Sequence, residues 1–234
     1  MIAKSAKRMG NFELASHYYM QVGDIMKAAK CLLKLGDLEK IIVFANNARS
    51  SEIYVLAANF LQTSDWHNDP NLMKAIINFY SKAKSYHHLA GFYDGCASLE
   101  IDEYRDYEKA AAALKEALKF ANKATTPDKE NRIQQLQQKL FFVEKFVEAR
   151  NMAETNPQEM LRLCQQLLEN PGVENAIRAG DVYAQMVECY YQNRDMNSAY
   201  SLINQMQKRG IPLNHYLDQE LVINIDTFII SLVG

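Results

Sequence analysis

A glycine followed by an asparagine or aspartate recurs every 13 residues near the start of the chain, at Gly10, Gly23 and Gly36. Glycine suits the left-handed backbone conformation that ends a helix, and Asn or Asp is a preferred N-cap for the next helix. Thirteen residues hold about three helical turns and a minimal connection. Helices joined so tightly run antiparallel and pack as hairpins. The spacing therefore predicts an array of short helices.

Alanine recurs four residues after several of these acidic or amide caps, and a bulky apolar residue follows each cap directly. A small side chain lets a neighbouring helix approach closely. We therefore expect these alanines to lie at helix crossings, together with the three turn glycines as structural repeat-packing residues. The predicted set is Ala15, Ala28, Ala110, Ala199, Gly10, Gly23 and Gly36. The cap Asp37 departs from the pattern, because Ile41 stands where alanine is expected.

Four of the five prolines follow a capping residue, the order typical of a helix start, at Pro70, Pro127, Pro157 and Pro171. These marks predict helices over 1–9, 11–21, 24–35, 37–48, 51–63, 70–82, 86–99, 104–124, 127–154, 157–169, 173–192, 195–209 and 215–231. The apolar stripe from Ile133 to Val147 fits packing inside such an array, although a coiled coil would share its spacing.

The predicted fold class is all-α: a right-handed α-solenoid of antiparallel helix pairs. Its small residues after each cap resemble the second helix of a tetratricopeptide repeat (TPR), although the 26 residues from Gly10 to Gly36 make a shorter period. We expect one continuous TPR-like array over 1–213. The segment 214–234 is predicted to be a helix or an extended segment, because Leu221–Ile230 is rich in Ile and Val.

The charge balance and the cysteine spacing exclude several kinds of partner. The net charge of −2 and the pI near 6.2 give no attraction to nucleic acid or to an anionic membrane surface. No apolar run approaches the length of a membrane span, so no direct membrane insertion is expected. Cys31, Cys96, Cys164 and Cys189 lie too far apart for a metal motif and are expected to be buried, reduced thiols.

Motifs for chemistry are absent from the sequence: there is no HExxH, Walker A, GxGxxG or GxSxG pattern. We therefore expect no catalytic residue, cofactor, metal or small-molecule substrate. One acidic cluster, Glu100, Asp102, Glu103, Asp106 and Glu108, has two interpretations. Carboxylates can act as acid and base or bind a cation, but they also crowd helix starts, which the helix dipole favours. The second interpretation is preferred.

Aromatic residues are the remaining candidates for partner contact. Tyr18-Tyr19 and Tyr190-Tyr191 are each expected to place one ring inward and the other toward a flank, where it would anchor a partner. Trp66 stands in a polar connector, where it either folds back onto the core or marks an interface. The sequence assigns no single residue to a protein interface.

Longer strings add a resemblance to a known family. Ala57–Tyr80 (AANFLQTSDWHNDPNLMKAIINFY) and Leu89–Ala110 (LAGFYDGCASLEIDEYRDYEKA) resemble the C-terminal helical-repeat region of the intraflagellar transport protein 140 family, subunits of intraflagellar transport complex A. The opening segment through Ile41 and the segment Ile177–Tyr183 match in the same order, and the resemblance weakens after about Leu213.

The resemblance implies a non-catalytic scaffold whose partners are other propeller-plus-solenoid subunits of complex A. It implies a place in retrograde transport and membrane-protein import, in the cilium or flagellum, at the ciliary base and in the cytoplasm. Since such proteins carry β-propellers before their repeats, we expect a piece of a longer chain; no capping repeat covers the first helix. Two alternatives are the solenoid of a vesicle-coat or tethering complex, and an enzyme with a site between helices.

Overall fold

The computed structural model describes residues 2–233, with side chains described to residue 231. This part of the chain is all-α, without a strand, and is 78% helical. The all-α solenoid of TPR-like helix pairs predicted from the sequence is thereby confirmed. This part of the chain divides into two compact units by its Cα packing. The first runs to Leu89 and includes Lys123–Thr125; the second holds Ala90–Asn122 and the chain from Thr126 onward.

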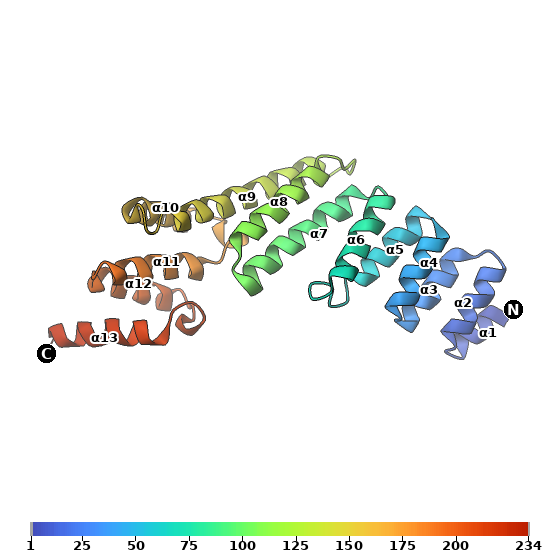
Figure 1. The fold of residues 1–234 in the computed structure, drawn as a ribbon, viewed down its shortest axis with the longest axis horizontal. Coiled ribbons are helices and arrows are strands. Elements are labelled where there is room, and N and C mark those ends of the chain that lie inside the picture. Colours follow the sequence, from blue (N-terminus) through green and yellow to red (C-terminus); the bar gives the residue numbers. More distant parts are fainter. Residues whose placement is uncertain (1, 234) are drawn as a thin grey trace. The chain divides into compact units, whose positions relative to one another are not determined.

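The first unit consists of short helices, each packed on the next (Figure 1). They are α1 (Ile2–Arg8), α2 (Phe12–Gln21), α3 (Ile25–Leu35), α4 (Leu38–Ala48), α5 (Ser51–Leu61) and α6 (Pro70–Lys82), with the start of α7 (Tyr86–Leu99). The turn glycines Gly10, Gly23 and Gly36 have φ of +78°, +75° and +79°. Each is followed by a residue whose side-chain oxygen accepts the backbone N–H three residues on. Local signals therefore set these helix ends.

The second unit continues from α7 through a π-helical turn, Glu100–Tyr104, into longer helices. They are α8 (Tyr107–Ala121), α9 (Lys129–Asn151), α10 (Pro157–Glu169), α11 (Ala179–Gln192), α12 (Met196–Lys208) and α13 (Gln219–Val233), with short 3₁₀ turns at Val173–Asn175 and Leu213–His215. From α8 on, each helix packs against the next. The segment 214–234, for which the sequence left helix and extended structure open, is helical from Gln219 to Val233. Residue 234 lies outside the described residues.

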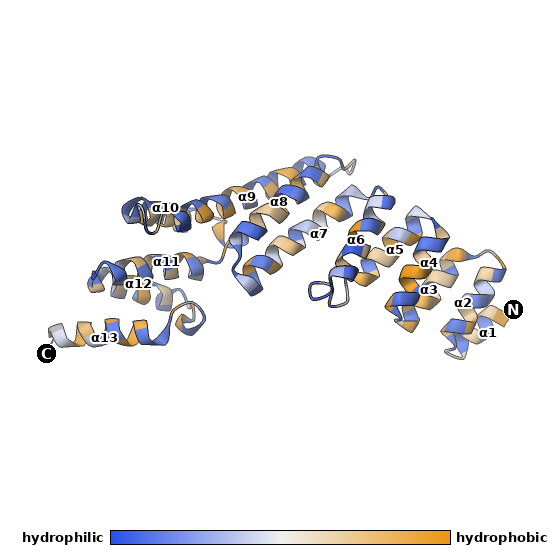
Figure 2. Ribbon diagram, viewed as in Figure 1, coloured by the Kyte–Doolittle hydropathy of each residue, from blue (hydrophilic) through white to orange (hydrophobic). Residues whose placement is uncertain are grey.

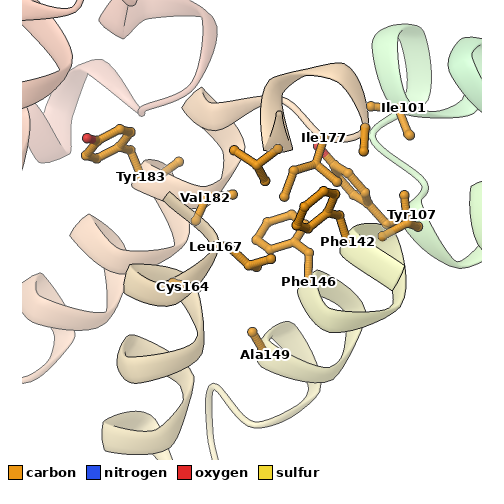
Figure 3. Close-up of a cluster of buried hydrophobic side chains, with 14 of the residues drawn as sticks. Ile101, Tyr107, Phe142, Phe146, Ala149, Cys164, Leu167, Ile177, Val182 and Tyr183 are labelled. Atoms are coloured by element: carbon orange, nitrogen blue, oxygen red, sulfur yellow. The ribbon is translucent and has the colours of Figure 1, made fainter. Parts of the chain in front are cut away.

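Apolar side chains fill the second unit where α8, α9, α10 and α11 meet. Figure 3 shows Phe142 and Phe146 of α9 pointing toward Ile177 and Tyr107, with Leu167 of α10 beside them. The rings of Tyr107 and Phe146 meet edge to face, with centroids 4.7 Å apart. Figure 2 shows apolar and polar residues alternating around these helices, which is the pattern of helices packed on one side.

Two predicted helix starts are wrong because their prolines lie in turns. Asn170 does not cap a helix at Pro171; it ends α10 in an extended conformation, and Gly172 follows with φ +93°. The helix expected over 173–192 is therefore a 3₁₀ turn, and α11 begins only at Ala179. Likewise α9 begins at Lys129, after Pro127 rather than at it. A proline after a polar residue fits a turn as well as a first helical turn.

The acidic cluster also lies differently from the prediction. Glu100, Asp102 and Glu103 belong to the π-helical turn that closes α7, while only Asp106 and Glu108 stand at the start of α8. The helix expected over 104–124 accordingly begins at Tyr107. The Asp106 N–H donates to the Glu100 carbonyl at 2.9 Å, and Arg105 between them has φ +53°. From this turn the Arg105 side chain reaches Asp181 and the Tyr216 ring.

Candidate functional site

The alanines expected at helix crossings are all fully buried. Ala15 and Ala28 belong to one apolar cluster of the first unit, whereas Ala110 and Ala199 belong to the large cluster of the second. Because 0% of each side chain is exposed, none has room for a larger group without displacing a neighbour. The specific claim that each marks a close helix crossing stays a prediction.

A buried carboxylate joins two distant segments of the second unit. Asp181, at the start of α11, is only 8% exposed. Its Oδ2 accepts the Tyr107 hydroxyl at 2.6 Å. Its Oδ1 lies 3.4 Å from Arg105 Nε, and its Oδ2 lies 3.8 Å from Arg178 Nε. Two guanidinium groups and one phenol therefore compensate a charge that burial alone would strongly destabilise.

Tyr216 closes this carboxylate centre from the far end of the sequence. Its ring lies directly over Gly180, where a Cβ atom would meet ring carbons. Its hydroxyl accepts Arg178 Nε at 3.3 Å, and the guanidinium groups of Arg178 and Arg105 lie 4.8 and 5.2 Å from the ring centroid. Arg105 also donates to the His215 carbonyl. Only glycine at 180 admits the tyrosine, so Gly180 is required for the cation–π stack.

A cavity of about 160 Å³ opens beside Asp181. Arg105, Arg150 and Tyr216 line it together with Glu188 of α11. Arg150 Nη1 donates to the Arg105 carbonyl at 3.4 Å, and its guanidinium lies 5.8 Å from the centre of the Tyr107 ring. Half-exposed arginines and aromatic rings are the groups that protein interfaces favour.

Electrostatics explain what these groups can do. Burial raises the pKa of Tyr107, and the Asp181 charge raises it further, so the phenol stays a hydrogen-bond donor. Burial likewise raises the pKa of Glu188, an effect that Arg150 opposes. Asp181 is engaged by Tyr107 and two arginines on both of its oxygens. The arrangement therefore fixes α8, α11 and the turn at His215 in one geometry.

A second buried carboxylate links α7 to α9. Asp94 is 8% exposed and accepts Arg132 Nη2 on Oδ2 at 2.6 Å and Lys139 Nζ on Oδ1 at 2.9 Å. The two cations are seven residues apart on α9, which is two helical turns, so they flank the carboxylate along one face. Beside them lies a cavity of about 260 Å³.

The burial of the tyrosine pairs and of Trp66 agrees only in part with the sequence prediction. Tyr19 is buried while Tyr18 is half-buried, as expected for one ring inward and one toward a flank. Tyr190 and Tyr191 are both half-buried, so that pair does not divide in the expected way. Trp66 is half-buried in the connector between α5 and α6, where its ring and the His67 ring meet edge to face.

The cysteines and acidic groups give no sign of metal chemistry in the described part of the chain. All four cysteines are buried and unpaired, and burial raises the pKa of Cys96 and Cys164 to about 12. Among residues 2–231 no group of three His, Cys, Asp or Glu side chains is arranged to hold a metal ion. None of the described helices is both long and apolar enough to cross a membrane.

Large apolar side chains that remain exposed concentrate in α1–α4. Eight of the thirteen such residues in the described part of the chain precede residue 44. Met9 and Val22 are 75% and 74% exposed, and each precedes one of the turn glycines. Exposed apolar side chains that gather in one region are candidates for partner contact.

Sequence reasoning missed both carboxylate centres. Asp94 and Asp181 stand inside strings that carry the family resemblance, AGFYD and IRAGDVY, but nothing in their spacing reveals their partners. Apart from Arg178, which precedes Asp181 by three residues, those partners lie 38 to 76 residues away along the chain. A charged residue at the apolar face of a predicted helix was the available signal.

Comparison with protein-family models gives two matches. Residues 87–207 match the model of the C-terminal TPR domain of intraflagellar transport protein 140, and residues 1–79 match the TPR domain shared by intraflagellar transport proteins 140 and 172. The first match includes the second unit's α8 to α12 and both carboxylate centres except for Tyr216 and His215. The family resemblance noted in the sequence is thereby confirmed. The chain belongs to the intraflagellar transport protein 140 family, by its C-terminal TPR domain and by the shared TPR domain that precedes it.

Proposed function

We propose that this chain is a non-catalytic protein-interaction scaffold of intraflagellar transport complex A. It assembles with other propeller-plus-solenoid subunits for retrograde ciliary transport and for the trafficking of ciliary membrane proteins. It acts in the cilium or flagellum, at the ciliary base and in the cytoplasm. The observation that carries this proposal is the pair of family matches over residues 1–79 and 87–207.

The fold supports a scaffold. Stacked helix pairs present an extended surface on which partner subunits are held in register. Exposed Met9, Val22 and Val43 give the first unit an apolar surface, and Arg105, Arg150 and Tyr216 give the second unit a cationic and aromatic one. These are the two compositions that protein interfaces favour at their centre.

Co-purification tests the proposal. The tagged chain is expressed in ciliated cells, isolated, and its bound proteins are quantified by mass spectrometry. Complex A subunits are expected to be enriched over the same tag without the chain. Enrichment of vesicle-coat or tethering subunits in their place would establish the alternative scaffold. Recovery of neither class would contradict the proposal.

A further inference from the structure

The 260 Å³ cavity of the second unit lies between α9 and the turn that follows α10. Its polar lining consists of Arg132, Gln135, Gln138, Lys139 and Asn175, and the buried ring of Phe142 belongs to the lining as well. No carboxylate is among the described residues that line it. Cations and amides without an acidic neighbour on the wall favour an anionic ligand.

Asp94 positions the two cationic side chains of the cavity, Arg132 and Lys139. Asp94 engages Arg132 at 2.6 Å and Lys139 at 2.9 Å, each through one carboxylate oxygen. Two positive charges against one negative charge leave the wall with a net positive charge. A guanidinium has five N–H donors and an ammonium three, so both retain donors for a second carboxylate. Their side chains are 35% and 29% exposed, so those donors are accessible.

The amide groups at the mouth are available too. Gln135, Gln138 and Asn175 are exposed, and their side chains form no hydrogen bond with another residue of the described chain. A Cβ at Gly172 would lie 3.8 Å from the amide nitrogens of both Gln138 and Asn175, so these two amides flank one glycine. A carboxamide both donates and accepts, as a peptide group does, and it pairs readily with an extended backbone.

We propose that this cavity binds an aspartate or glutamate side chain from an acidic segment of a partner protein. Arg132 and Lys139 pair with the carboxylate, while Gln138 and Asn175 bond the adjoining backbone. The volume of about 260 Å³ is just below the roughly 300–1,000 Å³ of metabolite pockets, and it suits one side chain with its peptide groups. The inference rests on the proposed scaffold function, and it names the chemistry of one contact.

A labelled acidic peptide tests the site directly. Fluorescein-hexaglutamate is titrated with the whole chain at low salt, and binding is followed by fluorescence anisotropy. Hexaglutamine serves as the uncharged peptide, and inorganic phosphate as a competing anion. We expect saturable binding of hexaglutamate and none of hexaglutamine. Failure of hexaglutamate to bind would overturn the inference. The inference would also be overturned if inorganic phosphate, at the same total charge as the peptide, abolished hexaglutamate binding. The cavity would then be a phosphate site.

Matched variants of α9 separate the cavity from general surface charge. Gln138→Glu places a carboxylate at the cavity, whereas Gln137→Glu makes the same change at an exposed residue that does not line it. Neither change touches the core, and circular dichroism verifies the fold. Gln138→Glu should weaken hexaglutamate binding roughly tenfold, because like charges then face each other. Gln137→Glu should leave it within about twofold. Equal losses would overturn the inference.

Co-purification and peptide binding together distinguish this inference from the scaffold function itself. If the wild-type chain recovers complex A subunits but binds no hexaglutamate, the cavity proposal is wrong and the scaffold stands. If the chain binds hexaglutamate selectively but recovers no subunits, the scaffold proposal is wrong and the cavity stands. Loss of a subunit in Gln138→Glu but not in Gln137→Glu supports both.

Discussion

The dipeptide Gly-Asp occurs in both units and serves opposite purposes in them. Gly23-Asp24 forms an exposed turn in which Gly23 has φ +75° and no atom lies within 4 Å of where a Cβ would stand. Asp24 caps the next helix through the Lys27 N–H. Gly180-Asp181 lies in the first turn of α11, beneath the Tyr216 ring, and Asp181 holds groups from distant segments.

The helix ends of the two units are specified in different ways. In the first unit the signals act within four residues, so a backbone conformation and one cap fix each helix end. In the second unit the same two residue types act through tertiary contacts, and their effect depends on partners more than 30 residues away. A substitution at one of these tertiary contacts in the second unit is therefore expected to lower the free energy of unfolding more than a substitution of a helix cap.

The largest effect is expected from Asp181→Ala. The change leaves Arg105 and Arg178 without their shared carboxylate and the buried Tyr107 hydroxyl without an acceptor. Removing one partner of a buried ion pair costs about 3 kcal/mol. Asp195→Ala, which removes a half-buried cap that accepts the Ser198 N–H, is the control and should cost about 1 kcal/mol. Urea denaturation measures both, and equal losses would contradict the assignment.

Ala110→Leu tests the buried alanines. Ala110 is fully buried, so leucine should overpack α8 and cost about 1–3 kcal/mol. Lys115→Leu in the same helix replaces an exposed side chain whose partner is Glu144, and it should matter far less. Thermal melts compare the two. Comparable destabilisation would show that the alanine four residues after a cap has no special place in packing.

Gly180→Ala distinguishes the two uses of glycine. A Cβ there displaces the Tyr216 ring, and we expect a cost of about 1–2 kcal/mol from overpacking. Gly91→Ala is the matched control in α7, where nothing lies within 4 Å. That change should stabilise by about 0.5–1 kcal/mol, since alanine favours helix interiors. Thermal melts of the two variants should therefore shift in opposite directions; a shift of the same sign would contradict this packing.

The smallest effect is expected at the Asp24 cap of the first unit. Its side-chain hydrogen bond with Lys27, and then the Lys27 N–H, hold the pKa of Asp24 below its ordinary value. A lowered pKa in the folded state gives stability that is present above the unfolded value of about 3.9 and is lost as pH falls through the folded value. Denaturation at pH 7 and at pH 2.5 should show the difference between Asp24→Ala and wild type disappearing in acid. A constant difference would argue against ionic capping.

The sequence was sufficient for the helices whose ends are coded locally. Gly36-Asp37 and Asn156-Pro157 marked helix boundaries within a residue or two, because caps act on the next three residues. It was insufficient where tertiary contacts decide. No residue pattern near Arg105 predicts a π-helical turn, and none near Asp94 indicates that Arg132 is its partner. Asn170-Pro171 has the same residue types as Asn156-Pro157, yet the Gly172 that follows has a positive φ and no α-helix begins there.

Hydrogen exchange of the Asp181→Ala variant tests the central contrast most directly, with mass spectrometry resolving protection along the chain. Stability in repeat arrays is a sum of local terms and nearest-neighbour contacts. We expect protection to fall in α8, in α11 and in the turn at Leu213–His215, while α2, α3 and α4 keep their wild-type protection. Equal loss of protection in α2–α4 would contradict the claim that the first unit is specified by its own local signals.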